Sequence, residues 1–318
     1  MKSRWRWRRR VRGAALGPLG CALVLAACGP GVRGEVIATT SLFAAGLSQD
    51  SDFLYWRTDD AIVRLSKQGG TPETIVGGQT PVANIVLSDD RVFWFHQNAG
   101  AISLHSAAKI GGDERVLDPD ENAGIAILRN LATDGSFLYW SNETGEIRRA
   151  PVIGGDAVTF GQTGIRASSV AAASGVVFAA VAVPPWFGIA RFEEGAVPLL
   201  LHESFDMPED IVLSSPPDDF YYWVERGTGA ANGAVYRASV AGSQVARLAT
   251  REVSPDRPFS DGANVYFSTG GATERIRRAR VSGSSEAVDF SDGHGDLVVD
   301  ATHVYWIDRN GSVHKARK

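Results

Sequence analysis

Cysteine is almost absent from this chain of 318 residues, which contains only Cys21 and Cys28. The signature sequences of common enzymes are also missing: GxSxG, HExxH, CxxC, a P-loop and a helix-opening GxGxxG do not occur. A disulfide scaffold and the usual metal-dependent and nucleotide-binding classes are therefore excluded. We expect no cofactor and no resident metal ion.

Amphipathic helical periodicity is also lacking after residue 34, and short strand-like runs bounded by Asp and Gly turns take its place. The feature that recurs is an aromatic pair, repeated seven times at intervals of 38 to 46 residues. The copies are Tyr55-Trp56, Phe93-Trp94, Tyr139-Trp140, Phe178-Ala179, Tyr222-Trp223, Tyr266-Phe267 and Tyr305-Trp306. A repeat of this length indicates a solenoid or a propeller.

Each copy has room for four short strands, which is the content of one propeller blade. We therefore predict an all-β, seven-bladed β-propeller over residues 35–318, with six or eight blades as the alternatives. The last copy ends after three strands at Lys318. The strand-like segment Glu35–Thr39 is predicted to supply the fourth strand and to seal the ring, which removes two open sheet edges.

The aromatic pairs are expected to be core residues, because neighbouring residues of an inner strand face opposite blades. Six copies also carry a basic residue on their third strand: Arg64, Arg149, Arg191, Arg237, Arg278 and Lys315. We expect these side chains to make salt bridges or cation–π contacts within the fold, rather than a cationic ring for an anionic ligand.

The first 27 residues have the pattern of a secretory signal peptide. Seven basic residues lie within residues 1–12, and residues 13–27 are apolar and small. The string Leu25-Ala26-Ala27-Cys28 resembles the bacterial lipobox. This resemblance implies cleavage before Cys28, diacylglycerol on its sulfur, and export to the cell envelope. Gly29 follows where an Asp would signal retention, so we expect the outer membrane. Residues 28–34 form the short tether.

The strings Tyr139-Trp140-Ser141-Asn142 and Tyr305-Trp306-Ile307-Asp308, with Gly145-Glu146-Ile147-Arg148-Arg149, resemble the YWTD repeat of low-density-lipoprotein-receptor propellers. The resemblance covers nearly all of residues 35–318 and implies the propeller fold. Propellers of that family have six blades, whereas seven copies are present here. The resemblance therefore bears on the fold much more than on the ligand.

Charge and loops provide the functional expectations. Removing residues 1–27 lowers the formal charge from −4 to −11, which argues against nucleic acid as a partner. Trp186 and Phe187, beside Pro184-Pro185, are expected to form an exposed apolar patch for an envelope protein or glycan. The alternative is that both rings fold back onto the next blade. We predict a binding or scaffolding module without catalytic activity.

Two other functions stay open. His202 with Glu203, and His294 with Asp296, are histidine–carboxylate neighbours that we place near one mouth of the channel. If they cluster, the chain would be a lyase or hydrolase acting on a polysaccharide or peptide. A purely structural envelope protein is the third option. The acidic string with Asp118, Asp120 and Asn122 has oxygen ligands suited to Ca²⁺, but we expect a solvated loop.

Overall fold

The structure is a computed structural model. It describes residues 32, 34–40, 43–98, 101–118, 131–162, 167–183, 186–203, 206–213, 219–228, 231–283 and 286–318. The predicted signal peptide and Cys28 lie outside these residues. Over the described ranges every regular element is a β-strand, and no helix occurs that could cross a membrane.

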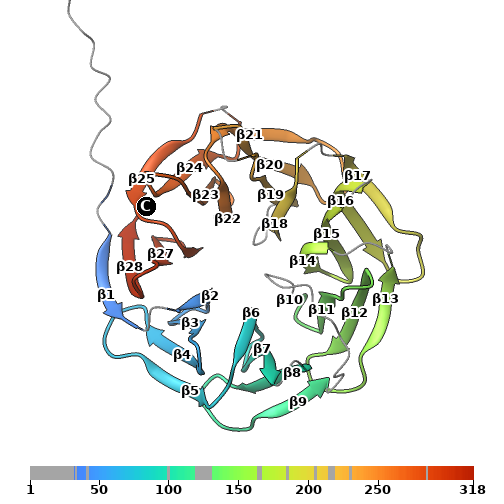
Figure 1. Ribbon diagram of the computed structural model, residues 1–318, viewed down its shortest axis with the longest axis vertical. Coiled ribbons are helices and arrows are strands. Elements are labelled where there is room, and N and C mark those ends of the chain that lie inside the picture. The colour runs from blue at the N-terminus through green and yellow to red at the C-terminus, as the bar shows by residue number, and fades with distance from the viewer. Residues whose placement is uncertain are drawn as a thin grey trace, which may run out of the picture. The chain divides into compact units, whose positions relative to one another are not determined.

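Seven four-stranded antiparallel sheets form a ring around a central axis, which confirms the seven-bladed β-propeller (Figure 1). From the axis outward, blade 1 has β2 (Ala45–Gln49), β3 (Phe53–Arg57), β4 (Ala61–Ser66) and β5 (Glu73–Gly77). Blade 2 has β6 (Pro81–Leu87), β7 (Arg91–Asn98), β8 (Ala101–Ala108) and β9 (Arg115–Asp118). Blade 3 has β10 (Leu131–Thr133), β11 (Phe137–Ser141), β12 (Glu146–Pro151) and β13 (Val158–Gln162).

The chain then continues around the ring. Blade 4 has β14 (Ala167–Ala173), β15 (Val176–Val183), β16 (Trp186–Glu193) and β17 (Leu199–Glu203). Blade 5 has β18 (Pro208–Leu213), β19 (Phe220–Glu225), β20 (Gly233–Ser239) and β21 (Ala246–Glu252). Blade 6 has β22 (Pro255–Ser260), β23 (Asn264–Thr269), β24 (Arg275–Arg280) and β25 (Val288–Asp292). Blade 7 has β26 (Asp296–Val299), β27 (His303–Ile307), β28 (Ser312–Arg317) and β1 (Glu35–Thr39).

The ring is closed by the two ends of the described chain. Strand β1 pairs antiparallel with β28, and Glu35 lies opposite Lys315 while Thr39 lies opposite Ser312. The closure predicted from the incomplete last repeat is therefore confirmed. Blade 7 thus has four strands like the others, and its outermost strand is contributed by residues that precede blade 1.

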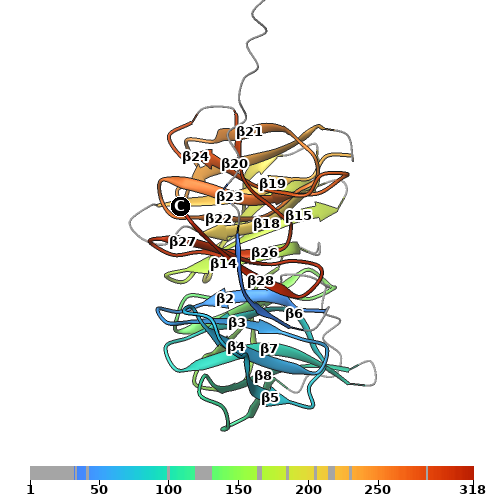
Figure 2. The same ribbon diagram turned by 90° about the vertical axis from the view of Figure 1, so that its left-hand side faces the viewer.

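The two faces of the ring carry different connections, because each blade is an antiparallel meander. The turns after the first and third strands lie on one face, which we call the Asp-turn face. There the N–H of Lys109, after β8, donates to the carbonyl of Asp90, after β6. The turns after the second strands and the links between blades lie on the other face, which we call the link face. Figure 2 shows the ring from the side.

The aromatic pairs fill the gaps between blades, as predicted from the repeat. Phe93 and Trp94 are both fully buried, and they enter different hydrophobic clusters. Phe93 packs with Leu131 and Trp140 of blade 3, whereas Trp94 packs with Ile62 of blade 1. Seven such clusters occur among the described residues, one for each gap. Each blade is thus held on both faces by its neighbours.

The basic residues of the third strands have the structural role that we expected. The guanidinium of Arg64 lies 4.6 Å from the ring centre of Phe53, and Arg149 lies at the same distance from Phe137. Arg149 also reaches Glu194 of the next blade at 2.7 Å. These cations therefore contact aromatic rings and carboxylates within a blade and between neighbouring blades. No cationic ring around the axis arises from these residues.

A repeated aspartate organises the Asp-turn face. Asp300 accepts hydrogen bonds from the N–H groups of Thr302 and His303, each at 2.8 Å, and from the Tyr305 hydroxyl at 3.1 Å. Lys67 of blade 1 reaches the same carboxylate at 3.3 Å. Burial alone would raise the pKa of Asp300, but these donors outweigh it and hold the pKa well below its usual range. Asp50 and Asp134 occupy the same position in blades 1 and 3.

Deleting β1 tests the closure. We expect a chain that starts at Thr40 to melt about 10 °C or more below a chain that starts at Gly31, because blade 7 then exposes the edge of β28. Thermal unfolding followed by circular dichroism measures the difference. Equal melting temperatures for the two chains would show that β1 does not hold the ring closed.

The aspartate turn predicts a pH dependence. Because the pKa of Asp300 is lowered on folding, its contribution to stability is present above the unfolded value of 3.8 and is lost as the pH falls toward the folded value. We expect Asp300→Asn to lower the free energy of unfolding by about 1–3 kcal/mol at neutral pH. The difference from wild type should shrink below about pH 4.

Urea unfolding at neutral pH and in acid measures this effect. The exposed turn residue Asp89, replaced in Asp89→Asn, is the control and should change little at either pH. A pH-independent difference between Asp300→Asn and wild type would contradict the role assigned to the Asp300 charge.

Candidate functional site

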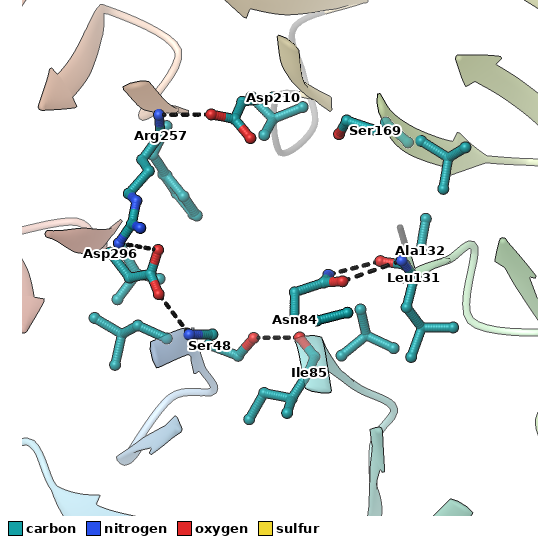
Figure 3. Close-up of a pocket in the computed structure, with 18 of the residues that line it drawn as sticks. Ser48, Asn84, Ile85, Leu131, Ala132, Ser169, Asp210, Arg257 and Asp296 are labelled. Carbon is teal, nitrogen blue, oxygen red and sulfur yellow. Dashed lines mark hydrogen bonds and ion pairs between the residues drawn. The ribbon is translucent and has the colours of Figure 1, made fainter. Parts of the chain in front are cut away.

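A channel runs along the axis of the propeller and encloses a cavity of about 570 Å³. The innermost strand of every blade contributes to its wall. Aliphatic side chains such as Ile85 and Leu297 make up much of this wall, while Arg57, Asn84, Asp210, Arg257 and Asp296 add polar groups. Figure 3 shows this arrangement.

Bulges shape the innermost strands where they begin, near the link face. The register shifts in β2, β6, β18 and β22, and the backbone enters the left-handed region at Gly46 (φ 71°), Ala83 (φ 59°), Asp210 (φ 48°) and Arg257 (φ 58°). Such bulges redirect side chains, and the left-handed region is costly for residues other than glycine. The strained positions Asp210 and Arg257 both line the channel.

The channel's charged residues join neighbouring blades (Figure 3). The guanidinium of Arg257 lies 2.5 Å from the Asp296 carboxylate, and the N–H of Arg257 donates to Asp210 at 3.2 Å. The other oxygen of Asp296 accepts the N–H of Gly46 at 2.5 Å. This chain of contacts connects blades 5, 6, 7 and 1. Asn84 similarly pairs with both backbone groups of Leu131, at 2.7 and 3.0 Å, across blades 2 and 3.

A second cavity of about 490 Å³ opens on the link face and shares Arg257 with the channel. Arg226, His294 and Arg309 also line it. Arg226 lies 2.9 Å from Glu209 and 3.3 Å from Asp256, and Arg309 lies 3.0 Å from Glu274. The mouth of the channel therefore presents several arginines whose charges are partly balanced by acids.

His294 is the buried titratable group of this second cavity, with 8% of its surface exposed. Its Nδ1 has no hydrogen-bond partner among the described residues. Burial, and then the charge of Arg257, lower the pKa of His294, so the neutral imidazole is favoured. The Nδ1 atom itself is buried, so it is an unsatisfied polar group behind the cavity wall.

His202 lies at a different place, on β17, the outermost strand of blade 4. Its ring is 5.1 Å from the ring of Trp223, and its Nε2 is 4.0 Å from the carboxylate of Glu225. Burial lowers the pKa of His202, and the Glu225 charge opposes this shift. With Glu203 it lines a third cavity of about 620 Å³ between blades 4 and 5.

The four residues of the predicted channel-mouth site are thus divided among three cavities. His202 and Glu203 share the cavity between blades 4 and 5, His294 lines the link-face cavity, and Asp296 lines the channel. Asp296 is engaged by Arg257 and Gly46. The structure therefore does not bring the two histidines into one acid–base cluster.

Trp186 and Phe187 belong to a paired strand. Val183 lies opposite Trp186 and Ala182 lies opposite Phe187 in the β15–β16 hairpin. Each strand of this hairpin has eight residues, as in the β7–β8 hairpin, whereas the other second and third strands have five to seven. Phe187 is half-buried, and the side chain of Trp186 lies outside the described part of the structure. The partner role of both residues stays a prediction.

The acidic string considered for Ca²⁺ is only partly described. Asp118 ends β9 and lies 3.9 Å from Arg148, while Asp120 and Asn122 lie outside the described residues. Over the ranges that the structure covers, no group of three or more His, Cys, Asp or Glu side chains could hold a metal ion.

Sequence reasoning missed the arginines of the mouth. Arg226, Arg257 and Arg309 come from blades 5, 6 and 7 and stand outside the repeated basic position. One local signal was available: Pro81, Pro208 and Pro255 each begin an innermost strand two residues before a left-handed residue. A proline at that place marks the strand start and the bulge.

No family model matches the sequence, and no curated protein matches it significantly. Solved structures do resemble the fold. A chain of a nidogen/laminin complex has 14% identity and a TM-score of 0.56, covering 75% of this chain and 94% of that one. YCF48 bound to D1 peptide has 10% identity and a TM-score of 0.65, with coverages of 90% and 96%.

A third similar structure is the GH74 xyloglucanase from Xanthomonas campestris. It has 12% identity and a TM-score of 0.69, and the match covers 90% of this chain and 54% of the enzyme. At these identities the similarity shows the fold alone. The chain is thus a β-propeller protein, and this fold supports both binding proteins and enzymes.

The ion pair in the channel provides a test of how the mouth is built. We expect Asp296→Ala to lower the free energy of unfolding by about 3 kcal/mol, because Arg257 and the N–H of Gly46 lose their acceptor. Asp296→Asn should cost less, since its amide oxygen can still accept the N–H of Gly46.

Urea denaturation at neutral pH measures both variants. Asp292→Ala is the matched control, because Asp292 is 81% exposed and pairs with Arg275 at the surface. Surface pairs contribute at most about 1 kcal/mol. If Asp296→Ala were no more destabilising than Asp292→Ala, the contact between blades 6, 7 and 1 would not support the ring.

Proposed function

We propose that this chain is an exported, lipid-anchored β-propeller that acts as a binding or scaffolding module of the bacterial envelope, held in the outer membrane. The lipobox-like string ending at Cys28 supports the anchor. The partner that we propose is an envelope protein or a glycan, bound at the link face.

The observation that carries this proposal is the contrast between the channel and the link face. The charged groups of the channel bind neighbouring blades, as the contacts of Arg257, Asp296 and Gly46 illustrate. The link face, by contrast, carries the long β7–β8 and β15–β16 hairpins and the cavity lined by Arg226, His294 and Arg309. Rigid blades that present unequal loops on one face suit recognition.

The similar structures are compatible with this proposal. One is a propeller in a complex with laminin, and another is bound to a peptide. Laminin is a protein, and the D1 partner is a peptide. We therefore propose a protein or peptide, bound at the link face, as the first candidate partner of this chain.

A pull-down from envelope extracts tests the contact residues. We expect the double variant Trp186→Ala, Phe187→Ala to recover its main partner about tenfold less than wild type, because aromatic anchors carry much of the energy of an interface. Phe43→Ala is the matched control, since Phe43 is an exposed aromatic residue on the same face, in the link before blade 1. Unchanged recovery of every partner by the double variant would refute the contact.

One observation favours an enzyme as the second candidate. His202 stands beside Glu225 in a cavity where Arg247 donates to the Tyr236 hydroxyl at 3.1 Å. This group could perform acid–base chemistry on a polysaccharide or peptide as a lyase or hydrolase. Turnover of such a substrate by wild type, lost in His202→Ala and retained in Trp186→Ala with Phe187→Ala, would favour the enzyme over the binding module.

A further inference from the structure

Three consecutive blades carry strongly exposed aliphatic residues on the rim of the Asp-turn face. Ile110, Ile153 and Val197 are 83%, 81% and 89% exposed, the largest values for big hydrophobic side chains among the described residues. Each lies in the connection between the third and fourth strands, in blades 2, 3 and 4 respectively. An exposed aliphatic side chain at one position is ordinary, but the same feature on three adjacent blades forms a surface.

The turn itself does not require an aliphatic residue. The blade 1 turn Lys67-Gln68-Gly69-Gly70 corresponds to Lys109-Ile110-Gly111-Gly112 in blade 2, and Gln68 is exposed at the place of Ile110. The outermost strands that follow the three turns add further exposed residues, namely Val116, Val158 and Leu199. We call these six residues the aliphatic rim: Ile110, Val116, Ile153, Val158, Val197 and Leu199.

The chain enters the propeller on this same face. The N–H of Val32 donates to the carbonyl of Phe290 at 2.8 Å, and Phe290 is the third residue of β25, the outermost strand of blade 6. In the gaps between blades 7 and 1 and between blades 1 and 2, a turn glycine lies close to the carbonyl of the corresponding residue of the outermost strand. A Cβ on Gly69 would lie 3.3 Å from the carbonyl of Ile37, and one on Gly111 would lie 3.4 Å from that of Ile75. Val32 therefore takes the position of the missing third-to-fourth strand turn of blade 7.

From these positions we propose that the Asp-turn face of the propeller lies against the lipid bilayer, with the aliphatic rim inserted at its surface. This inference rests on the lipidation of Cys28 in the proposed function. Cys28 precedes Val32 by four residues, a reach of about 14 Å at most. The lipid on Cys28 thus holds the blade 7 side of the ring close to the membrane.

The aliphatic rim lies on the other side of the ring, because blades 3 and 4 are across the axis from β1 (Figure 1). Two contacts on opposite sides of one face lay the ring flat on the membrane. The lipid and the inserted side chains both contribute to the membrane affinity, as two anchoring signals do in other membrane-bound proteins. The link face then points away from the bilayer, toward the proposed partner.

The attraction between the aliphatic rim and the bilayer is hydrophobic. The formal charge of −11 after residue 27 gives the chain no general affinity for anionic lipid. Near Val197 the carboxylate of Glu194 is 72% exposed. We therefore expect the contact to persist in neutral lipid and at high salt, where an electrostatic contact would be screened.

Fluorescent labels at single sites test the orientation. The full chain is produced in a bacterium that processes lipoproteins, and each variant carries one label. Once Cys28 carries its lipid, the sequence after residue 27 has no other thiol. Ile110→Cys, Ile153→Cys and Phe43→Cys each offer one label site, and Phe43 is the exposed control on the link face. The labelled proteins are reconstituted into phosphatidylcholine vesicles with or without nitroxide-bearing lipid.

We expect nitroxide lipid to quench the Ile110→Cys and Ile153→Cys labels at least about threefold more than the Phe43→Cys label, because the rim side chains enter the lipid surface. Mass and membrane fractionation first establish that Cys28 carries the lipid. If the label at Phe43→Cys is then quenched as much as the rim labels, or more, the proposed orientation alone is overturned. A soluble chain without lipid on Cys28 would overturn both the anchor and the orientation.

A second variant separates insertion from simple proximity. Ile110→Gln with Ile153→Gln places at both turns the residue that blade 1 already has there, so folding should be retained. We expect quenching of a label on Val197→Cys to fall about twofold in this background and to stay unchanged with Phe43→Gln. Unchanged quenching in both backgrounds would show that the rim does not insert.

Discussion

Every blade of this ring must bury both of its faces against its neighbours, and the rest of the structure depends on that requirement. The gap between two radial sheets is wedge-shaped, and large rings at adjacent positions of the second strand fill it from both sides, as Phe93 and Trp94 do. The requirement cannot be met at the ends of an open array. Strand β1 therefore completes blade 7 and covers the edge of β28.

Closure also explains how polar groups are used near the axis. The innermost strands of neighbouring blades approach each other with their edges unsatisfied, and side chains bridge them: Asn84 to Leu131, Asp210 to Arg257, and Asp296 to Gly46. Bulges and left-handed residues place these bridges. The strain is therefore tied to the joining of blades.

The two faces differ in regularity, and the proposed functions divide between them. On the Asp-turn face the same aspartate turn recurs and the connections are short, and blades 2, 3 and 4 carry the most exposed aliphatic side chains there. The link face has hairpins of unequal length and the cavities that hold His294 and His202. A module held to a surface by its regular face offers its variable face to partners, so anchoring and recognition do not compete for the same residues.

Four features could be predicted from the sequence: the blades, the buried aromatic pairs, the basic residues of the third strands and the closing strand. Each is a local pattern that repeats about every forty residues, and repetition separates it from chance. The mouth of the channel could not be predicted in this way. Gly46 and Asp296 are 250 residues apart and meet only because the ring closes, and Arg257 reaches the channel only because a bulge redirects it. Sequence spacing determined the repeat, while long-range closure decided which single residues meet, because non-repeated side chains have no periodic signal and become neighbours only in three dimensions.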